Sequence, residues 1–195
     1  MHGLINRSLE SFLKGTYGAD LWRAVIEEMD PGFETFEPMF HYEDALTQAL
    51  VDASARYLAK PRDVLLEDFG TYLITDQRAE RVRRLLRFGG VDYLDFLHSL
   101  DDLRGRARLA IPDLDLPQLE LLENGDNDFT LLCRTPHDGF GFVFLGVLRA
   151  LADDYGALAF LEHLGRSDDC ETLSIRLLDA GFSDGRDFSL TEMVG

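Results

Sequence analysis

The spacing of apolar residues changes near Pro112, and this change constrains the fold more than any other feature of the chain. Before it, apolar side chains recur three or four residues apart, as from Leu9 to Phe12, which is the period of an amphipathic helix. After it, leucines in the segment 114–121 largely alternate with polar residues, which is the period of a half-buried strand. A helical first half followed by a mixed second half predicts an α+β fold with an antiparallel sheet.

Six helices are expected in the first half. Their apolar stripes and boundary signals place them near residues 4–13, 21–29, 43–57, 61–69, 82–86 and 93–104. Gly105 follows the sixth helix directly and favours a helix end there. Trp22, the single tryptophan, lies on the apolar stripe of the second helix, so we expect it to be buried against Leu4, Ile5 or the helix that carries Phe96 and Leu100.

Four strands and one long helix are expected in the second half. Leucines from Leu114 to Leu121 predict a first strand, an Asn-Gly-Asp-Asn turn follows, and Phe129 to Arg134 predicts the second strand of a hairpin. Phe140 to Tyr155 reads as the long helix. Two final strands are expected near residues 158–164 and 171–178, around a turn at 165–169.

Composition excludes several classes of function. The net charge of −17 argues against DNA, RNA or an anionic membrane as a partner, and no apolar run is long enough to cross a membrane. With Cys133 and Cys170 as the only cysteines, no disulfide framework is implied and a cytoplasmic location is expected. The arginine-rich runs 78–90 and 104–108 are exceptions to the acidic balance. They indicate either solvated helix faces or a docking surface for an acidic partner or ligand.

The stretch FLHSLDDLRGRARLAIPDLDLPQLELLE, from Phe96 to Glu123, resembles the core signature of the heme-nitric oxide/oxygen binding (H-NOX) family. Four features match that family at consistent spacing: FL-x-x-LD-x-L, a proline eight residues beyond position 104, the opening around Ile5 and Trp22, and FGTYL at 69–73. The resemblance implies one domain over 1–195. It would comprise a helical subdomain (about 1–60), a pocket and sheet subdomain (about 61–180) and a tail (about 181–195).

The resemblance also implies a heme pocket, and this chain departs from it in three places. Arg104 stands where the family has the histidine that ligates the iron, and arginine offers no lone pair to a metal. The family's Tyr-x-Ser-x-Arg clamp for the heme propionates reads Cys133-x-Thr135-x-His137. The zinc site of some members is reduced to His163 and Cys170, with Arg166 in place of a cysteine. The positions assigned to the former heme pocket are Arg104, Ile5, Leu100, Pro117, Cys133, Thr135 and His137.

Two interpretations of Arg104 remain open. In one, it lies in the last turn of the sixth helix, with its stem on apolar surface and its head in water. In the other, its guanidinium enters the former heme pocket and holds a carboxylate or fills space. Substitute iron ligands are few, because His98 should face elsewhere on its helix, whereas His137 could approach the edge of the pocket.

Three functions are therefore carried forward, and a catalytic role is not expected because no constellation of catalytic residues is visible. The first is a non-enzymatic sensory or regulatory protein with lost or altered heme ligation. By analogy with the family, it would signal through contact with a histidine kinase or a cyclic-nucleotide enzyme. The second is a working heme sensor for NO or O2 with a substitute iron ligand or none. The third is a binding module for another apolar ligand in the former heme cavity.

Overall fold

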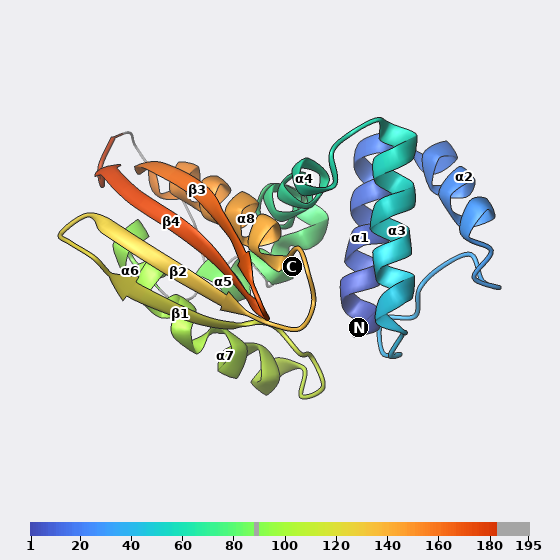
Figure 1. Cartoon of the computed structure of the whole chain (residues 1–195), viewed down its shortest axis with the longest axis horizontal. Coiled ribbons are helices and arrows are strands. Elements are labelled where there is room, and N and C mark those ends of the chain that lie inside the picture. Colours follow the sequence, from blue (N-terminus) through green and yellow to red (C-terminus); the bar gives the residue numbers. More distant parts are fainter. Residues whose placement is uncertain (88–89, 183–195) are drawn as a thin grey trace, which may run out of the picture.

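The computed structural model describes residues 1–87 and 90–182, and it confirms the expected α+β class. Figure 1 shows a helical lobe on one side of the molecule and an antiparallel sheet on the other, with α4 and α8 between them. In the part of the chain that the structure describes, no helix combines the length and the apolar character needed to cross a membrane. The expected tail falls beyond residue 182 for most of its length and so lies outside the described residues.

The helical lobe consists of α1 (Gly3–Tyr17), α2 (Ala19–Met29) and α3 (Asp44–Leu58). Trp22 is buried here, as expected, and its indole N–H donates to the carbonyl of Glu34 at 3.1 Å. Its ring packs against Phe36, whereas Phe96 and Leu100 belong to a separate cluster beneath the sheet. Of the expected partners, Ile5 packs against the same cluster as Trp22, whereas the helix that carries Phe96 and Leu100 does not belong to it. The loop after α2 folds back and supplies Phe36 in addition.

Helix α4 (Arg62–Thr75) joins the lobe to the sheet by packing against α8 (Phe140–Tyr155). The two helices approach closely because glycines lie at their crossing. A Cβ atom at Gly70 would collide with the carbonyl oxygen of Val143, and one at Gly146 would collide with that of Glu67. Gly70 is the glycine of the FGTYL segment, so its role here is to allow close packing of two helices.

The segment between α4 and the sheet differs from the expected helices. A 3-10 turn (Gln77–Ala79) leads into α5 (Glu80–Arg87). The expected helix 93–104 is instead divided into α6 (Tyr93–His98), a 3-10 turn (Ser99–Asp102) and α7 (Leu103–Ala110). The predicted end at Gly105 was wrong. The chain stays helical because Leu103 and Ala107, one turn apart, are both buried and hold α7 against its neighbours.

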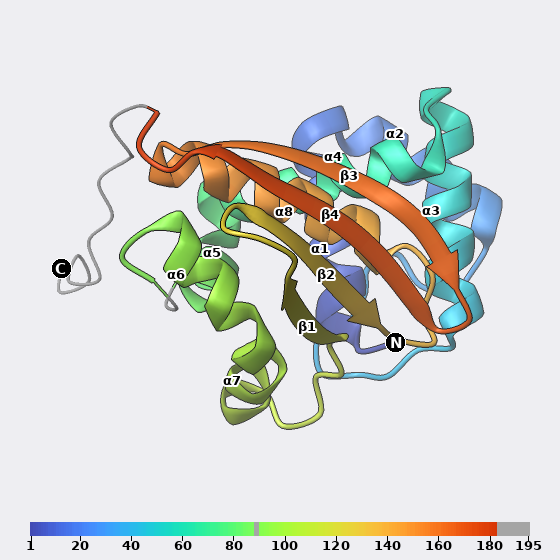
Figure 2. The ribbon, with the colours of Figure 1, turned by 60° about the vertical axis from the view of Figure 1, so that its left-hand side comes forward.

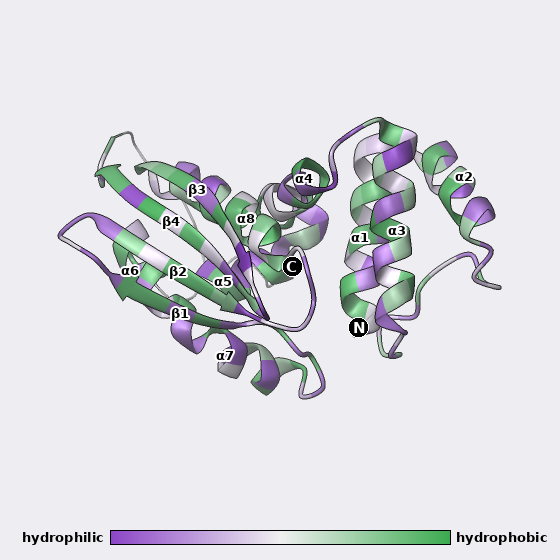
Figure 3. Ribbon diagram, viewed as in Figure 1, coloured by the Kyte–Doolittle hydropathy of each residue, from purple (hydrophilic) through white to green (hydrophobic). Residues whose placement is uncertain are grey.

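The sheet contains β1 (Gln118–Glu123), β2 (Asp128–Arg134), β3 (Leu158–Ser167) and β4 (Cys170–Asp179) in the order β1-β2-β4-β3. The first strand begins later than expected, because the segment before Pro117 is a loop in which Leu114 is nonetheless buried. Hydrophobic and hydrophilic residues alternate along the strands, and α8 crosses behind the sheet (Figures 2 and 3). The face that α8 covers carries the buried residues Leu119, Phe129, Leu131, Cys133, Leu173 and Ile175.

Candidate functional site

Arg104 lies in the first turn of α7 and points to the loop that precedes β1. Its Nη2 donates to Oδ1 of Asp115 at 2.5 Å, and Nη2 of Arg108 donates to the same oxygen at 3.0 Å. The hydrogen bond from Arg104 is the main cause that holds the pKa of the Asp115 carboxyl below its usual value. About a third of the Arg104 side chain is exposed. Neither interpretation of Arg104 is confirmed in full. Arg104 lies in the first turn of a helix and not in the last, and its carboxylate partner lies at the surface and not in the former heme pocket.

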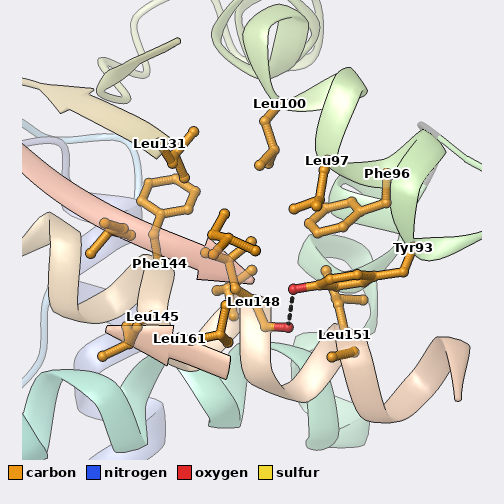
Figure 4. Packing of buried hydrophobic residues seen from close by; sticks show 14 of the residues in the cluster. Tyr93, Phe96, Leu97, Leu100, Leu131, Phe144, Leu145, Leu148, Leu151 and Leu161 are labelled. Atoms are coloured by element: carbon orange, nitrogen blue, oxygen red, sulfur yellow. Dashed lines mark hydrogen bonds between the residues drawn. The ribbon is translucent and has the colours of Figure 1, made fainter. Parts of the chain in front are cut away.

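The positions between α6, β2 and α8, where the resemblance puts part of the heme pocket, form a closed apolar core. Leu100, Leu131 and Cys133 each have a relative exposure of 0%. Figure 4 shows Leu97 and Leu100 on the same side of this core, with the Tyr93 hydroxyl donating to the carbonyl of Leu148 at 3.0 Å. A cavity large enough to admit water would leave accessible surface on the side chains that line it. These side chains are therefore in contact with one another and not with open space.

A small cavity lies beside this core, on the side of the helical lobe. It is lined mainly by apolar side chains, among them Ile5, Val51, Phe69, Phe140 and Val143. Its volume is about 40 Å³. Pockets for drug-sized ligands measure roughly 300–1,000 Å³, so this cavity has room for a few water molecules or a very small ligand only.

The three residues at the clamp positions do not converge on one point. Cys133 faces the core, and burial raises the pKa of its thiol. Thr135 is buried and its hydroxyl accepts a hydrogen bond from the backbone N–H of His137 at 3.2 Å. The His137 ring turns toward α3, where Nδ1 lies 3.3 Å from Oδ2 of Asp44. Pro117 is buried immediately before β1, and His98, as expected, faces elsewhere, 3.6 Å from the Glu123 carboxylate.

A buried carboxylate next to the clamp positions escaped the sequence analysis. Glu171 lies opposite Cys133 in the sheet and is only 1% exposed. Its carboxylate accepts hydrogen bonds from the backbone N–H groups of Gly139, at 2.6 Å, and of Gly141. It therefore occupies the N-terminus of α8, where unpaired N–H groups and the helix dipole favour an anion.

Arg166 completes this arrangement. Its Nη1 donates to Oε1 of Glu171 at 3.2 Å, and its Nη2 donates to the carbonyl of Thr135 at 3.1 Å. A Cβ atom at position 141 would collide with the Glu171 carboxylate, so a larger residue there would displace that carboxylate from the helix N-terminus. The two glycines of the Gly139-Phe-Gly141 segment could have indicated that another group comes close to the backbone there. The sequence does not show which side chain that is.

His163 and Cys170 also lie around Glu171, but they do not make a metal site with it. The His163 ring stacks on Phe142 with ring centres 4.0 Å apart, its Nδ1 accepts from the backbone N–H of Gly165, and its Nε2 lies 3.6 Å from Glu171. The Cys170 thiol lies 3.8 Å from the carbonyl of Glu171. Within residues 1–87 and 90–182, no group of three or more His, Cys, Asp or Glu side chains could hold a metal ion.

A heme group would need an axial ligand, an apolar slot and partners for its propionates. Here Arg104 forms an ion pair with Asp115, and the core around Leu100 has no open space. The backbone carbonyl of Thr135 already accepts a hydrogen bond from Arg166. The charges of Glu171 and Arg166 are paired with each other and so leave no free cation for a propionate beside Cys133. These residues do not fit a heme group in the arrangement described.

The fold itself is that of the H-NOX proteins. An H-NOX protein from S. oneidensis in the Fe(II)NO ligation state superposes with a TM-score of 0.77 at 18% identity, covering 92% of this chain and 100% of that one. The I5F mutant of T. Tengcongensis H-NOX superposes with a TM-score of 0.76 at 16% identity, covering 92% and 99%. These likenesses establish the fold, which in the described residues places seven α-helices before a hairpin, a long helix and a final hairpin.

The family follows from the sequence match. The model of the haem-NO-binding family matches residues 2–162, so the chain belongs to that family. Similar curated proteins are soluble guanylate cyclase 89Da of Drosophila melanogaster (23% identical over 158 residues) and soluble guanylate cyclase gcy-34 of Caenorhabditis elegans (28% over 157 residues). The matches cover 81% and 78% of this chain but only 24% and 23% of those relatives, so the chain spans about a quarter of their length.

Proposed function

We propose that this chain is a non-enzymatic sensory or regulatory domain of the H-NOX type that works without heme and signals by contact with a partner protein. The observation that carries the proposal is the pair formed by Arg104 and Asp115. The residue in the place of the iron ligand has a partner of its own at the surface. The helix that it begins is therefore tethered to the loop before β1 and not to a metal.

Two further contacts support the same proposal. Cys133, Leu100 and their neighbours fill the space beneath the sheet with apolar side chains, which stabilises a domain that has no cofactor to pack against. Glu171 supplies the negative charge at the N-terminus of α8 from within the chain. Both are contacts that the chain makes with its own side chains and that need no cofactor.

The partner proposed here is a signalling enzyme. The relatives that the chain resembles are named as soluble guanylate cyclases, and they are about four times longer than the matched region. A cyclic-nucleotide enzyme or a histidine kinase would therefore receive the signal, whether it belongs to the same polypeptide or to another. The domain would act on this enzyme by changing which of two conformational states the domain itself prefers. A ligand of the domain, or the concentration of its partner, would set that preference.

The visible absorption spectrum tests the proposal. Purified protein is mixed with equimolar hemin under reducing conditions, and the S. oneidensis H-NOX protein is treated in parallel as a positive control. We expect no Soret band at one heme per chain. A stable five-coordinate histidyl heme would overturn the proposal. A stoichiometric band of another type would favour a working heme sensor with a substitute ligand.

Nitric oxide provides a second measurement. Without an iron–protein bond, the gas has no mechanical connection to α7, so titration with nitric oxide should leave the fluorescence of Trp22 unchanged. A saturable, reversible change at micromolar gas would return the chain to the working gas sensors. Trp22 is a suitable reporter because it is buried in the helical lobe, 6.2 Å from Phe36 between ring centres.

A further inference from the structure

The loop between α2 and α3, residues 30–43, presents two neighbouring apolar side chains to solvent. Met39 is 74% exposed and Phe40 is 61% exposed, and together they are called the loop tip here. Figure 1 shows the loop, in light blue, running from the end of α2 back to the start of α3 along the outside of the helical lobe. One exposed apolar residue is ordinary on a protein surface, so what surrounds the loop tip decides whether it is a contact site.

The other Phe and Tyr side chains of this loop pack inward. Phe36 is 1% exposed, and the centre of its ring lies 5.1 Å from that of Phe33 and 5.0 Å from that of Tyr42. All three belong to or pack against the core of the helical lobe. Phe40 is not part of this core, so the loop buries three of its four Phe and Tyr residues and leaves the fourth outside with Met39.

Backbone hydrogen bonds hold the loop tip in place. The N–H of Phe40 donates to the carbonyl of Glu37 at 3.2 Å, and the Phe40 carbonyl accepts from the N–H of Gly3 at 2.7 Å. The N–H of Tyr42 donates to the carbonyl of Met1 at 2.9 Å. A Cβ atom at position 3 would collide with the carbonyl oxygen of Glu37, so the loop lies directly against the first turn of α1. A contact surface fixed in this way loses little conformational entropy when a partner covers it.

Carboxylates flank the loop tip in the chain, and the loop contains no lysine or arginine. The exposed carboxylates of the loop are Asp30, Glu34, Glu37 and Glu43. In residues 1–87 and 90–182, none of these four side chains forms an ion pair or a hydrogen bond with another group. A group that covers the loop tip would therefore meet unpaired negative charge, which favours a partner that brings positive charge.

The loop also ends beside a contact between the helical lobe and the sheet half of the molecule. Asp44 follows the loop as the first residue of α3. Its Oδ2 lies 3.3 Å from Nδ1 of His137, in the segment between β2 and α8, and its Oδ1 accepts from the N-terminal amine at 2.6 Å. A partner seated on the loop tip would therefore lie close to a place where the two halves of the molecule touch.

We propose that the loop tip and its carboxylates form a docking surface for a basic amphipathic helix of another protein. The apolar stripe of such a helix would cover Met39 and Phe40. Lysines or arginines beside the stripe would pair with Glu34, Glu37 and Glu43. A basic amphipathic helix has the same arrangement as this surface, apolar residues bordered by charge, with the opposite sign. The inference rests on the proposed function, because it names the surface through which the signalling partner is contacted.

The charges argue against other occupants. Nucleic acids and anionic membranes would be repelled by these carboxylates and by the net charge of −17. A second copy of this chain would bring the same acidic excess, 36 acidic against 19 basic residues. A zwitterionic membrane would take up Met39 and Phe40 only by drawing unpaired carboxylates toward the bilayer, which is costly. A cationic, partly apolar helix meets none of these penalties.

The experiment uses a fluorescent amphipathic peptide of Leu and Lys, with Leu at positions i, i+3, i+4 and i+7. One control peptide has the same composition in scrambled order, so that it keeps the charge and loses the stripe. A second control has Gln in place of Lys, so that it keeps the stripe and loses the charge. Binding to the full chain is followed by fluorescence anisotropy. We expect the Leu–Lys peptide to bind at least about ten-fold more tightly than either control, and to weaken as salt is added.

One pair of variants tests the apolar contact. Met39→Ser with Phe40→Ser should weaken binding of the Leu–Lys peptide about ten-fold or more, because it removes both apolar anchors. The control pair is Val91→Ser with Leu109→Ser, at side chains that are 93% and 88% exposed, and it should have less than about a two-fold effect. Equal losses in the two pairs would show that the peptide binds exposed apolar residues without preference.

A second pair tests the charges. Glu34→Gln with Glu37→Gln should weaken binding by about five- to ten-fold and reduce its dependence on salt. The control pair, Asp126→Asn with Glu162→Gln, changes the net charge equally at exposed positions of the sheet half and should have less than about a two-fold effect. The glutamine pair keeps the test decisive if the serine pair disturbs the loop.

Several results would overturn the inference. They are no measurable binding of the Leu–Lys peptide, equal binding of the scrambled peptide, or equal losses in the variants and their controls. Binding to phosphatidylcholine vesicles that the serine pair abolishes would make a membrane the occupant, and a dimer in sedimentation equilibrium that the serine pair dissociates would make it a second copy of this chain. Uptake of heme by protein that still binds the peptide would defeat the proposed function alone. Heme-free protein that does not bind the peptide would defeat this inference alone.

Discussion

Arg104 donates a 2.5 Å hydrogen bond to Asp115, eleven residues further along the chain, and so ties the first turn of α7 to the loop before β1. The resemblance to the family signature puts the iron ligand at this position. The same helix is therefore held by an ion pair at the surface, and the strength of that pair becomes a measurable property of the domain.

Arg104→Ala should cost less than about 1 kcal/mol of unfolding free energy at neutral pH, because both partners are partly exposed and solvent screens the pair. The lowered pKa of Asp115 means that the pair stabilises the protein above the ordinary pKa of an aspartate, and that this stabilisation is lost as pH falls through the lower folded-state pKa. Urea denaturation across this range would check the prediction. A cost that is independent of pH would show that packing, not charge, explains the effect.

Arg104→His alone should not create a heme protein. The imidazole would supply an iron ligand, but the core around Leu100 would remain closed and the clamp positions would still lack an arginine. Adding Cys133→Tyr, Thr135→Ser and His137→Arg should be required for any stable uptake, because these substitutions restore the family's partners for the propionates. Hemin titration followed at the Soret band measures this series. Tight, stoichiometric binding by the single variant would contradict the prediction.

Glu171→Gln should cost about 2–4 kcal/mol of unfolding free energy, because it removes the charge that neutralises Arg166 and weakens two hydrogen bonds at the N-terminus of α8. Glu162→Gln, on an exposed position of β3, is the matched control and should stay within about 0.5 kcal/mol. Chemical denaturation gives both values. Equal effects at the two positions would show that Glu171 does not hold α8.

Glu10→Gln should destabilise the helical lobe in a pH-dependent way. Burial raises the pKa of Glu10, but hydrogen bonds from Lys14 and from the backbone N–H of Phe36 outweigh burial and bring it below the ordinary value. The carboxylate therefore stabilises the protein above the unfolded-state pKa, and this contribution disappears as pH falls through the folded-state pKa.

At neutral pH the expected cost of Glu10→Gln is about 1–3 kcal/mol, and the gap from the wild type should narrow at acidic pH. Thermal unfolding at both pH values would measure it. Glu27→Gln, at an exposed position of α2, serves as the control and should cost little. A gap at Glu10 that does not narrow in acid would contradict the electrostatic explanation.

The sequence by itself determined the class of fold and the family. Segments such as Phe140–Tyr155 and Phe129–Arg134 show hydrophobic periods of about 3.6 and 2 residues. These periods follow from the local geometry of a helix or a strand, which does not depend on where the segment lies in the fold. The sequence likewise shows an arginine at the position where the resemblance expects the iron ligand, and arginine has no lone pair to offer a metal.

Only the tertiary structure decided what Arg104 and Glu171 contact. The break of the expected sixth helix into α6, a 3-10 turn and α7 depends on which residues are buried against other elements, and so does the closed core around Leu100. The bond from Gly139 to Glu171 spans 32 positions, and the Arg104–Asp115 pair forms across the α7–β1 loop. Such partners are chosen by packing and chain topology, which a local pattern of residues does not encode.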